Sequence, residues 1–251
     1  MTFVQGGAGR LRVSDGGSGE PVLVLVHGLG SNLETWRPVL DRLRASHRAI
    51  AYDQRGHGAS DPAAVPEYTV DALADDLERV VSPLHLGKFW LIGHSFSGTV
   101  ISAYAAKHPD QLLGLVYVDA VGDASHASPE LKEYFRKSDE GMTPARLRDS
   151  YAEMLGPKAK PVTRDSVLDS SAGMDLKAFA ALRKSMVAFD GIAAANAFPG
   201  RRIAIVAEAD EFPTSAARLP ATRRVFVPNV SHWLMLDDPD ATTRAIEESI
   251  R

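Results

Sequence analysis

Short apolar runs alternate along the chain with longer stretches in which apolar residues recur at helical spacing. The run from Val22 to His27 opens with Val-Leu-Val-Leu-Val and has no polar alternation, so both faces of this strand should be buried, as in a parallel sheet. Alternation of strands with helices predicts a doubly wound α/β sheet with right-handed crossovers. The predicted strands are Arg10–Val13, Val22–His27, Arg48–Tyr52, Phe89–Ile92, Leu113–Val118, Arg202–Ala207 and Arg223–Val227, with a hairpin loop over Ser14–Gly19 between the first two.

Helices are expected between these strands. Two of them begin at good N-caps, Ser31-Asn32 and Asp240; the helix after Asp71 places Leu73, Leu77 and Val80 at helical spacing, and the one after Phe96 is rich in alanine. The helix that starts at Phe96 should stop before His108-Pro109, because the residue before a proline disfavours helical backbone. The predicted helices are Asn32–Leu43, Asp71–Val81, Phe96–Lys107 and Ala241–Ile250.

The alternation breaks between Gly122 and Phe198, where no strand pattern occurs. Helix starts appear instead at Ser128-Pro129 and Thr143-Pro144, each an N-cap followed by proline at the first helical position. A further helix is expected from Asp175 to Asp190. We therefore expect a helical lid over residues 122–198, inserted into a core formed by residues 1–121 and 199–251; a plain helical packing module is the alternative.

Composition narrows the class of protein. The chain has 251 residues, 45% hydrophobic and 24% charged, with a formal net charge of −4; this excludes a disordered chain and argues against nucleic acid as a partner. It contains no cysteine, which excludes disulfides, zinc–thiolate sites and thiol nucleophiles. No apolar run is long enough to span a membrane, and no signal peptide is visible at the start. A cytoplasmic protein is the expectation.

The strongest chemical signal is the segment Leu91–Gly98. An apolar strand ends, Gly93-His94-Ser95 follows, and an Ala-rich helix begins. A serine on such a sharp strand-to-helix turn is exposed for nucleophilic attack, and small neighbours are needed because the turn is tight. The usual pattern is G-x-S-x-G, and here Ser97 occupies the fifth position with Gly98 directly after it. The alternative is an ordinary turn in which Ser95 is the N-cap.

A second signal is His27-Gly28-Leu29-Gly30, directly after the buried strand. A free backbone N–H from such a loop, together with the N–H that follows the nucleophile, can form an oxyanion hole. The donors would be Leu29 and Phe96. Alternatively, the loop is an ordinary turn that needs glycine for positive φ.

A third signal is the run Asp53-Gln54-Arg55-Gly56-His57-Gly58-Ala59-Ser60. With the first two signals, this D-x-R-G-H-G-x-S run resembles the α/β-hydrolase superfamily, in its esterase- and lipase-like branch. The resemblance covers Met1–Ala120 and Gly200–Arg251, and it implies a sheet of about eight strands with helices on both faces. The run is interpreted as structural, with Asp53 and Arg55 holding the loop by hydrogen bonds and His57 outside the catalytic machinery.

The resemblance also implies a catalytic triad in the order serine, acid, histidine. His232 follows the last predicted strand and matches the family's final histidine, while His94 should pack below the serine. For the acid, Asp210 follows the strand Arg202–Ala207 and is favoured. Asp119, at the end of the strand Leu113–Val118, is the main rival, and Asp123 is a weaker one.

Serine at position 95 disfavours haloalkane dehalogenases and epoxide hydrolases, which resemble this fold but carry aspartate at that turn. The prediction is a serine hydrolase that acts on an ester, lactone or related acyl bond through an acyl-enzyme, with no metal and no cofactor. Its expected partner is a small apolar acyl substrate; no oligomeric state is predicted. The alternatives are a cofactor-free haloperoxidase or perhydrolase, a C–C bond hydrolase, and a hydrolase-like ligand receptor or signalling regulator. Six aromatic residues are candidates for an apolar pocket: Trp36, Phe96, Tyr134, Phe135, Phe179 and Trp233.

Overall fold

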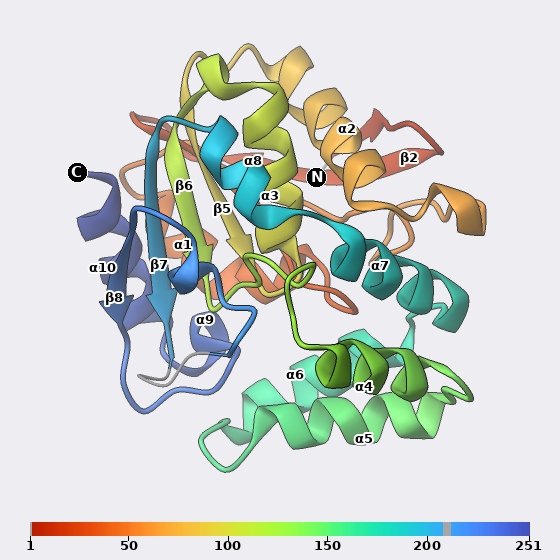
Figure 1. Ribbon diagram of the computed structural model, residues 1–251. Coiled ribbons are helices and arrows are strands. Elements are labelled where there is room, and N and C mark those ends of the chain that lie inside the picture. The colour runs from red at the N-terminus through yellow and green to blue at the C-terminus, as the bar shows by residue number, and fades with distance from the viewer. Residues whose placement is uncertain (1, 208–211) are drawn as a thin grey trace.

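The computed structural model describes residues 2–207 and 212–251, which form one sheet flanked by helices (Figure 1). The strands are β1 (Thr2–Gln5), β2 (Arg10–Gly16), β3 (Val22–Val26), β4 (Ala49–Tyr52), β5 (Phe89–His94), β6 (Leu112–Val118), β7 (Arg201–Val206) and β8 (Thr222–Phe226). The α-helices are α1 (Arg37–Leu43), α2 (Val70–Val81), α3 (Ser97–Lys107), α4 (Pro129–Asp139), α5 (Pro144–Leu155), α6 (Pro161–Ala172), α7 (Leu176–Ala188), α8 (Gly191–Ala197), α9 (Leu234–Asp237) and α10 (Pro239–Ile250).

The sheet has eight strands in the order β1-β2-β4-β3-β5-β6-β7-β8. β1 pairs antiparallel with β2, and β2 pairs antiparallel with β4. All the remaining neighbours are parallel. The predicted mostly parallel α/β sheet is therefore confirmed.

Strand β3 lies in the middle of this sheet, between β4 and β5. All five of its residues are buried, as its uninterrupted aliphatic run predicts for a strand covered on both faces. Helices α2, α3 and α8 lie on one face of the sheet, and α1 and α10 lie on the other (Figure 1). The carboxyl end of β3 is thereby held inside a packed core.

Two strand predictions were wrong. The hairpin over Ser14–Gly19 does not form, because β4 lies between β2 and β3 and pairs with both. The glycine-rich segment signals a change of direction but not the pairing partner, and the fully buried β4 occupies the more central position. Strand β1 was missed because its four residues form an edge strand that is mostly exposed.

The segment from Gly122 to Phe198 contains helices α4 to α8 and no strand among its residues, all of which are described. Ser128 and Thr143 cap α4 and α5 through their side chains, as predicted. Asp175, where a further helix was expected to start, caps α7 in the same way. Helices α6 and α8 were not predicted. Helix α8 packs against α3 of the core layer. Helices α4, α5 and α6 form a separate group on the side toward which β5, β6 and β7 point (Figure 1).

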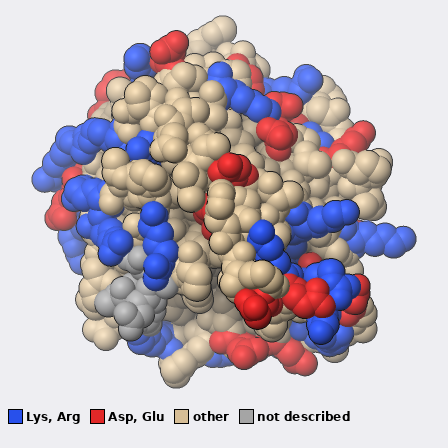
Figure 2. Space-filling view, viewed as in Figure 1, with Lys and Arg blue, Asp and Glu red and all other residues tan. Residues whose placement is uncertain are grey.

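Charged side chains of both signs are interspersed on the face shown in Figure 2. Positive side chains gather on the left of this view, over β7 and β8, where the sequence has Arg201, Arg202, Arg223 and Arg224. None of the helices in the described parts of the chain has the length and apolar character needed to cross a membrane.

Candidate active site

Ser95 lies on the turn between β5 and α3, with a positive φ of 55°. Its carbonyl accepts hydrogen bonds from the N–H groups of Gly98 and Val121, and its own N–H donates to Val118 O. A Cβ at position 93 would lie 2.8 Å from Ser97 O, so the turn requires glycine there. A non-glycine residue held at positive φ is strained, and such strain persists only where the surrounding structure enforces it.

Ser95 begins a continuous chain of hydrogen bonds. Its hydroxyl donates to His232 Nε2 at 2.8 Å, and His232 Nδ1–H donates to Asp119 Oδ2 at 2.6 Å. Asp119 follows β6 directly and also has positive φ, 43°. Its second oxygen accepts a hydrogen bond from Ala207 N at 3.1 Å. Three distant segments thus align one hydroxyl, one imidazole and one carboxylate, which can pass a proton from Ser95 to His232.

The electrostatics of this chain suit proton transfer. Burial alone would raise the pKa of Asp119, but the hydrogen bond and charge interaction with His232 and the N–H of Ala207 outweigh it and lower that pKa. Asp119 therefore stays ionised and can stabilise a positive charge on His232. Burial, followed by the neighbouring His232, lowers the pKa of His94 to about 3. Neutral His94 donates from Nε2 to His232 O at 2.9 Å, and its ring packs against the His232 ring with centroids 4.7 Å apart.

Among the described residues, the carboxylate that contacts His232 is Asp119, the rival in the sequence prediction. The favoured Asp210 lies outside the described residues. Asp123 accepts hydrogen bonds from Ser125, His126 and Gly191. The signal that points to Asp119 is its position immediately after a buried parallel strand adjacent to β5, because carboxyl ends of parallel strands meet at one edge of the sheet.

The loop after β3 lies against Ser95. A Cβ on Gly28 would be 3.0 Å from both Ser95 Cβ and His94 Nδ1, so the close approach needs glycine. In the described parts of the chain, the N–H groups of Leu29 and Phe96 donate no hydrogen bond. Two unpaired backbone donors next to a nucleophile are the groups from which an oxyanion hole is built. The peptide that follows is held on both edges: Leu29 O accepts from Tyr151 Oη at 2.6 Å, and Gly30 N donates to His57 Nε2 at 3.2 Å.

Residues of the D-x-R-G-H-G run, Asp53–Gly58, hold this loop by hydrogen bonds and ion pairs, as interpreted from the sequence. Asp53 accepts from Leu33 N at 2.7 Å and pairs with Arg12 at 2.6 Å. Arg55 forms a buried ion pair with Asp76 at 2.6 Å.

The His57 ring is occupied by its Nδ1–H hydrogen bond to Arg55 O and by the Gly30 N–H. Burial, followed by the nearby His27, lowers the pKa of His57 to about 3. His57 is therefore a neutral structural acceptor.

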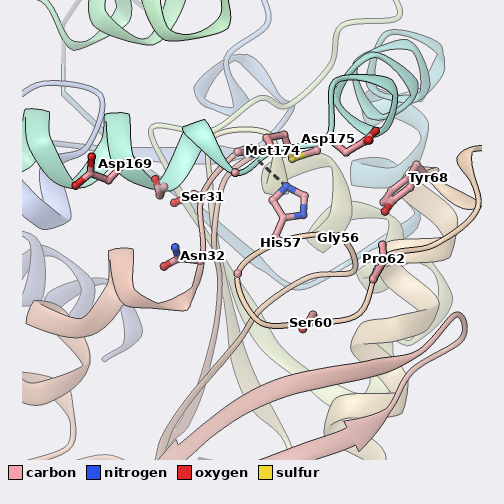
Figure 3. Close-up of a pocket in the computed structure, with 14 residues that line it drawn as sticks. Ser31, Asn32, Gly56, His57, Ser60, Pro62, Tyr68, Asp169, Met174 and Asp175 are labelled. Atoms are coloured by element: carbon pink, nitrogen blue, oxygen red, sulfur yellow. Dashed lines mark hydrogen bonds between the residues drawn. The ribbon is translucent and has the colours of Figure 1, made fainter. Parts of the chain in front are cut away.

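A cavity of about 390 Å³ lies beside this loop, between the core and helices α6 and α7. Figure 3 shows Asp169, Met174 and Asp175 on the helical side, facing His57 and its neighbours on the core loops. Neither Ser95 nor His232 lines it, and it contains none of the six aromatic candidates. Its lining is mostly glycine and side chains with hydroxyl, amide, imidazole or carboxylate groups, with one proline and one methionine: Gly30, Ser31, Asn32, Gly56, His57, Gly58, Ser60, Pro62, Tyr68, Asp169, Ser170, Gly173, Met174 and Asp175.

Among the described residues, one group could offer ligand atoms to a metal ion: Asp123, His126 and Asp190, whose donor atoms lie within 4.8 Å of one another. These atoms are already engaged. Asp123 accepts from His126 Nδ1 and from Gly191 N, and Asp190 caps α8 through Ala193 N. The hydrogen bond from Gly191 N to Asp123 links the start of the segment 122–198 to helix α8 near its end.

Comparison with known proteins gives a family match and several relatives. A family model described as the alpha/beta hydrolase fold matches residues 21–171. The chain is 32% identical to epoxide hydrolase 3 from Xenopus tropicalis over 109 residues, which are 43% of this chain but only 30% of that protein. It is 26% identical to the sn-1-specific diacylglycerol lipase ABHD11 from Danio rerio, over 90% of this chain and 77% of that protein.

Among solved structures, a thermophilic esterase from Thermogutta terrifontis is similar, with a TM-score of 0.83 and 25% sequence identity, covering 98% of this chain and 96% of that one. The family match covers more than half of this chain, and the relatives named are hydrolases. The chain belongs to the α/β-hydrolase fold family.

Proposed function

We propose that the protein is a serine hydrolase that cleaves a carboxylic ester or a related acyl bond through an acyl-enzyme. The observation that carries the proposal is the unbroken hydrogen-bond chain Ser95–His232–Asp119. The serine that begins it sits on a strained strand-to-helix turn, where a nucleophile is held clear of the backbone. Relatives named as a lipase and an esterase support the choice of acyl transfer.

In the proposed reaction, Ser95 Oγ attacks the carbonyl carbon of the substrate while its proton passes to His232 Nε2. Asp119 stabilises the resulting imidazolium. The N–H groups of Leu29 and Phe96 bind the negative oxygen of the tetrahedral intermediate. His232 then protonates the departing alcohol, and the acyl group remains on Ser95. In the second half, His232 takes a proton from water, the hydroxide attacks the acyl carbon, and the acid leaves as Ser95 regains its proton.

Asp119 takes the place of the acid in this proposal, instead of Asp210. Its 2.6 Å contact with His232 Nδ1 fixes both the orientation and the tautomer of the ring. Its low pKa keeps it anionic. The chain itself supplies the nucleophile, the base, the acid and the two oxyanion donors, so the proposed reaction uses no cofactor.

Residues 122–198 are proposed to be the lid of this enzyme, inserted into a core of residues 1–121 and 199–251. Support comes from helices α4, α5 and α6, which lie on the side where the strands end (Figure 1). Tyr151 from α5 contacts Leu29 O beside Ser95. A small acyl substrate would enter between the lid and the core. Phe96 and Trp233 are buried there next to the functional serine and histidine and suit an apolar acyl group.

The test is hydrolysis of a short p-nitrophenyl ester by the wild type and by Ser95→Ala. The matched control is Ser166→Ala, which removes an exposed hydroxyl on α6. The wild type and the control should hydrolyse the ester at the same rate, and Ser95→Ala should fall to the background rate. Equal rates for the wild type and Ser95→Ala would overturn the proposal.

A further inference from the structure

One side chain from the helical segment reaches the loop that carries a proposed oxyanion donor. Tyr151 lies on α5, is only 5% exposed, and donates its hydroxyl hydrogen to Leu29 O at 2.6 Å. Its ring packs on Trp233, with ring centroids 5.9 Å apart, and Trp233 meets His232 edge-on at 4.9 Å. Tyr151 therefore contacts both the loop after β3 and the residue that follows the proposed base.

The hydrogen bond from Tyr151 acts on a peptide that is held from its other side as well. The Leu29 carbonyl accepts from Tyr151, and the N–H of the same peptide, on Gly30, donates to His57 Nε2 at 3.2 Å. His57 cannot turn away without losing its bond to Arg55 O. The Leu29 N–H belongs to the preceding peptide, whose carbonyl, Gly28 O, lies 2.8 Å from His27 Nδ1 and accepts from Ser31 N at 3.3 Å. The two peptide planes meet at the Leu29 Cα, so holding both of them fixes the backbone rotation at Leu29 and with it the direction of the Leu29 N–H.

Helix α5 packs closely against this loop at Gly30. Gly30 has φ of 64°, and a Cβ at this position would collide with the Tyr151 hydroxyl. Burial raises the pKa of Tyr151, so its hydroxyl stays protonated and able to donate. Leu147 and Leu155, one helical turn before and after Tyr151, are also buried, and they anchor the helix face from which Tyr151 projects.

We propose that Tyr151 is a positioning residue for the oxyanion hole. Its hydroxyl holds the Leu29–Gly30 peptide so that the Leu29 N–H points at the developing oxyanion, and docking of α5 completes the hole. This inference rests on the proposed function, because it presumes an oxyanion at Ser95. It assigns the lid a role in the chemical step, separate from any role in admitting substrate.

The test compares Tyr151→Phe with the wild type. Phenylalanine keeps the ring on Trp233 and removes only the hydroxyl, so packing is preserved. The matched control is Tyr104→Phe on α3, which removes a tyrosine hydroxyl that bonds to Glu78 and Gln111. Turnover of a p-nitrophenyl ester is measured per active site, with sites counted by a fluorophosphonate that labels serine hydrolases.

The Tyr151 hydrogen bond is present in the free protein, but the N–H that it positions binds the oxyanion only in the transition state. Its loss should therefore lower kcat of Tyr151→Phe by about threefold to tenfold, with KM within about twofold of wild type. A trifluoromethyl ketone, which mimics the tetrahedral intermediate, should bind more weakly by a similar factor, while the product carboxylate binds as before. The midpoint of the pH profile should stay in place, because the contacts of His232 and Asp119 are untouched. Tyr104→Phe should match the wild type in every assay.

Two failures are distinguishable. If Tyr151→Phe matches the wild type in kcat and in affinity for the ketone, the positioning role is refuted, and the proposed function still holds as long as Ser95→Ala is inactive. An equal loss of affinity for the ketone and for the product carboxylate would also refute it, because that is the mark of a general packing defect. If Ser95→Ala is as active as the wild type, the proposed function itself has failed.

Discussion

Replacing Asp119 by asparagine isolates the role of its charge. The side chain keeps its shape, but it can no longer offer an anionic oxygen to His232 Nδ1–H. That contact is 2.6 Å long, and both side chains are nearly buried, 10% exposed for His232 and 12% for Asp119. With an amide opposite, His232 can instead take the tautomer in which Nε2 carries the hydrogen. In that tautomer it cannot accept the proton of Ser95.

The size of the effect follows from these two losses. A hydrogen bond to a charged partner contributes about 1.5–3 kcal/mol, which is roughly 10- to 150-fold in rate. Where the same change in a serine protease also fixes the wrong tautomer, kcat falls by about 10⁴. We therefore expect Asp119→Asn to lower kcat by about 10² to 10⁴, with a much smaller change in KM.

The assay is steady-state hydrolysis of a p-nitrophenyl ester, with circular dichroism to verify folding. Asp123→Asn serves as a control, because Asp123 bonds to Ser125, His126 and Gly191, and Asp210→Asn tests the acid favoured from the sequence. Both should retain most of the activity. The reasoning is refuted if Asp210→Asn loses more activity than Asp119→Asn.

Three further predictions concern the surrounding structure. Arg55→Met should lower the free energy of unfolding, measured by urea titration, by about 3–5 kcal/mol, because it leaves the buried Asp76 carboxylate without its ion-pair partner. Arg136→Ala removes an exposed ion pair and should leave the urea midpoint unchanged. Equal midpoints for the two variants would contradict this. The wild type should be more stable than Asp119→Asn above about pH 4, and this advantage should shrink as acid protonates a carboxylate whose pKa is lowered in the folded state; urea unfolding from pH 2 to 7 checks it, and a gap that widens in acid would refute it. Gly30→Ala should lower kcat by about tenfold or more while far-UV circular dichroism stays the same, because its Cβ would displace the hydroxyl from α5; wild-type turnover would refute the claimed fit.

Local sequence patterns were sufficient to predict most of the core. The buried strand Val22–Val26 follows from its composition, and the turn at Ser95 follows from small residues between an apolar run and an Ala-rich helix. Helix α6 was missed because Lys160 supplies no side-chain cap. Helix α8 was missed because its first residue, Gly191, is more often a sign that a helix ends.

The features that the sequence could not predict depend on contacts between residues far apart in the chain. Asp119 and His232 are 113 positions apart, and a carboxylate after either of two neighbouring strands satisfies the same motif. The contact of Asp119 with the imidazole comes from the packing of the chain and not from a local pattern. Tyr151 and Leu29 are 122 positions apart, and no periodicity on α5 distinguishes a tyrosine that donates to a distant loop from one that only fills the core.

The most direct test of the central claim is to locate the covalent bond. The protein is treated with a p-nitrophenyl dialkyl phosphate, which phosphorylates activated serine, and the modified peptide is identified by mass spectrometry. Ser95 as nucleophile predicts one dialkylphosphoryl group per chain, on the peptide containing Ser95, with none in Ser95→Ala. Modification of another residue, or equal modification of Ser95→Ala, would contradict it.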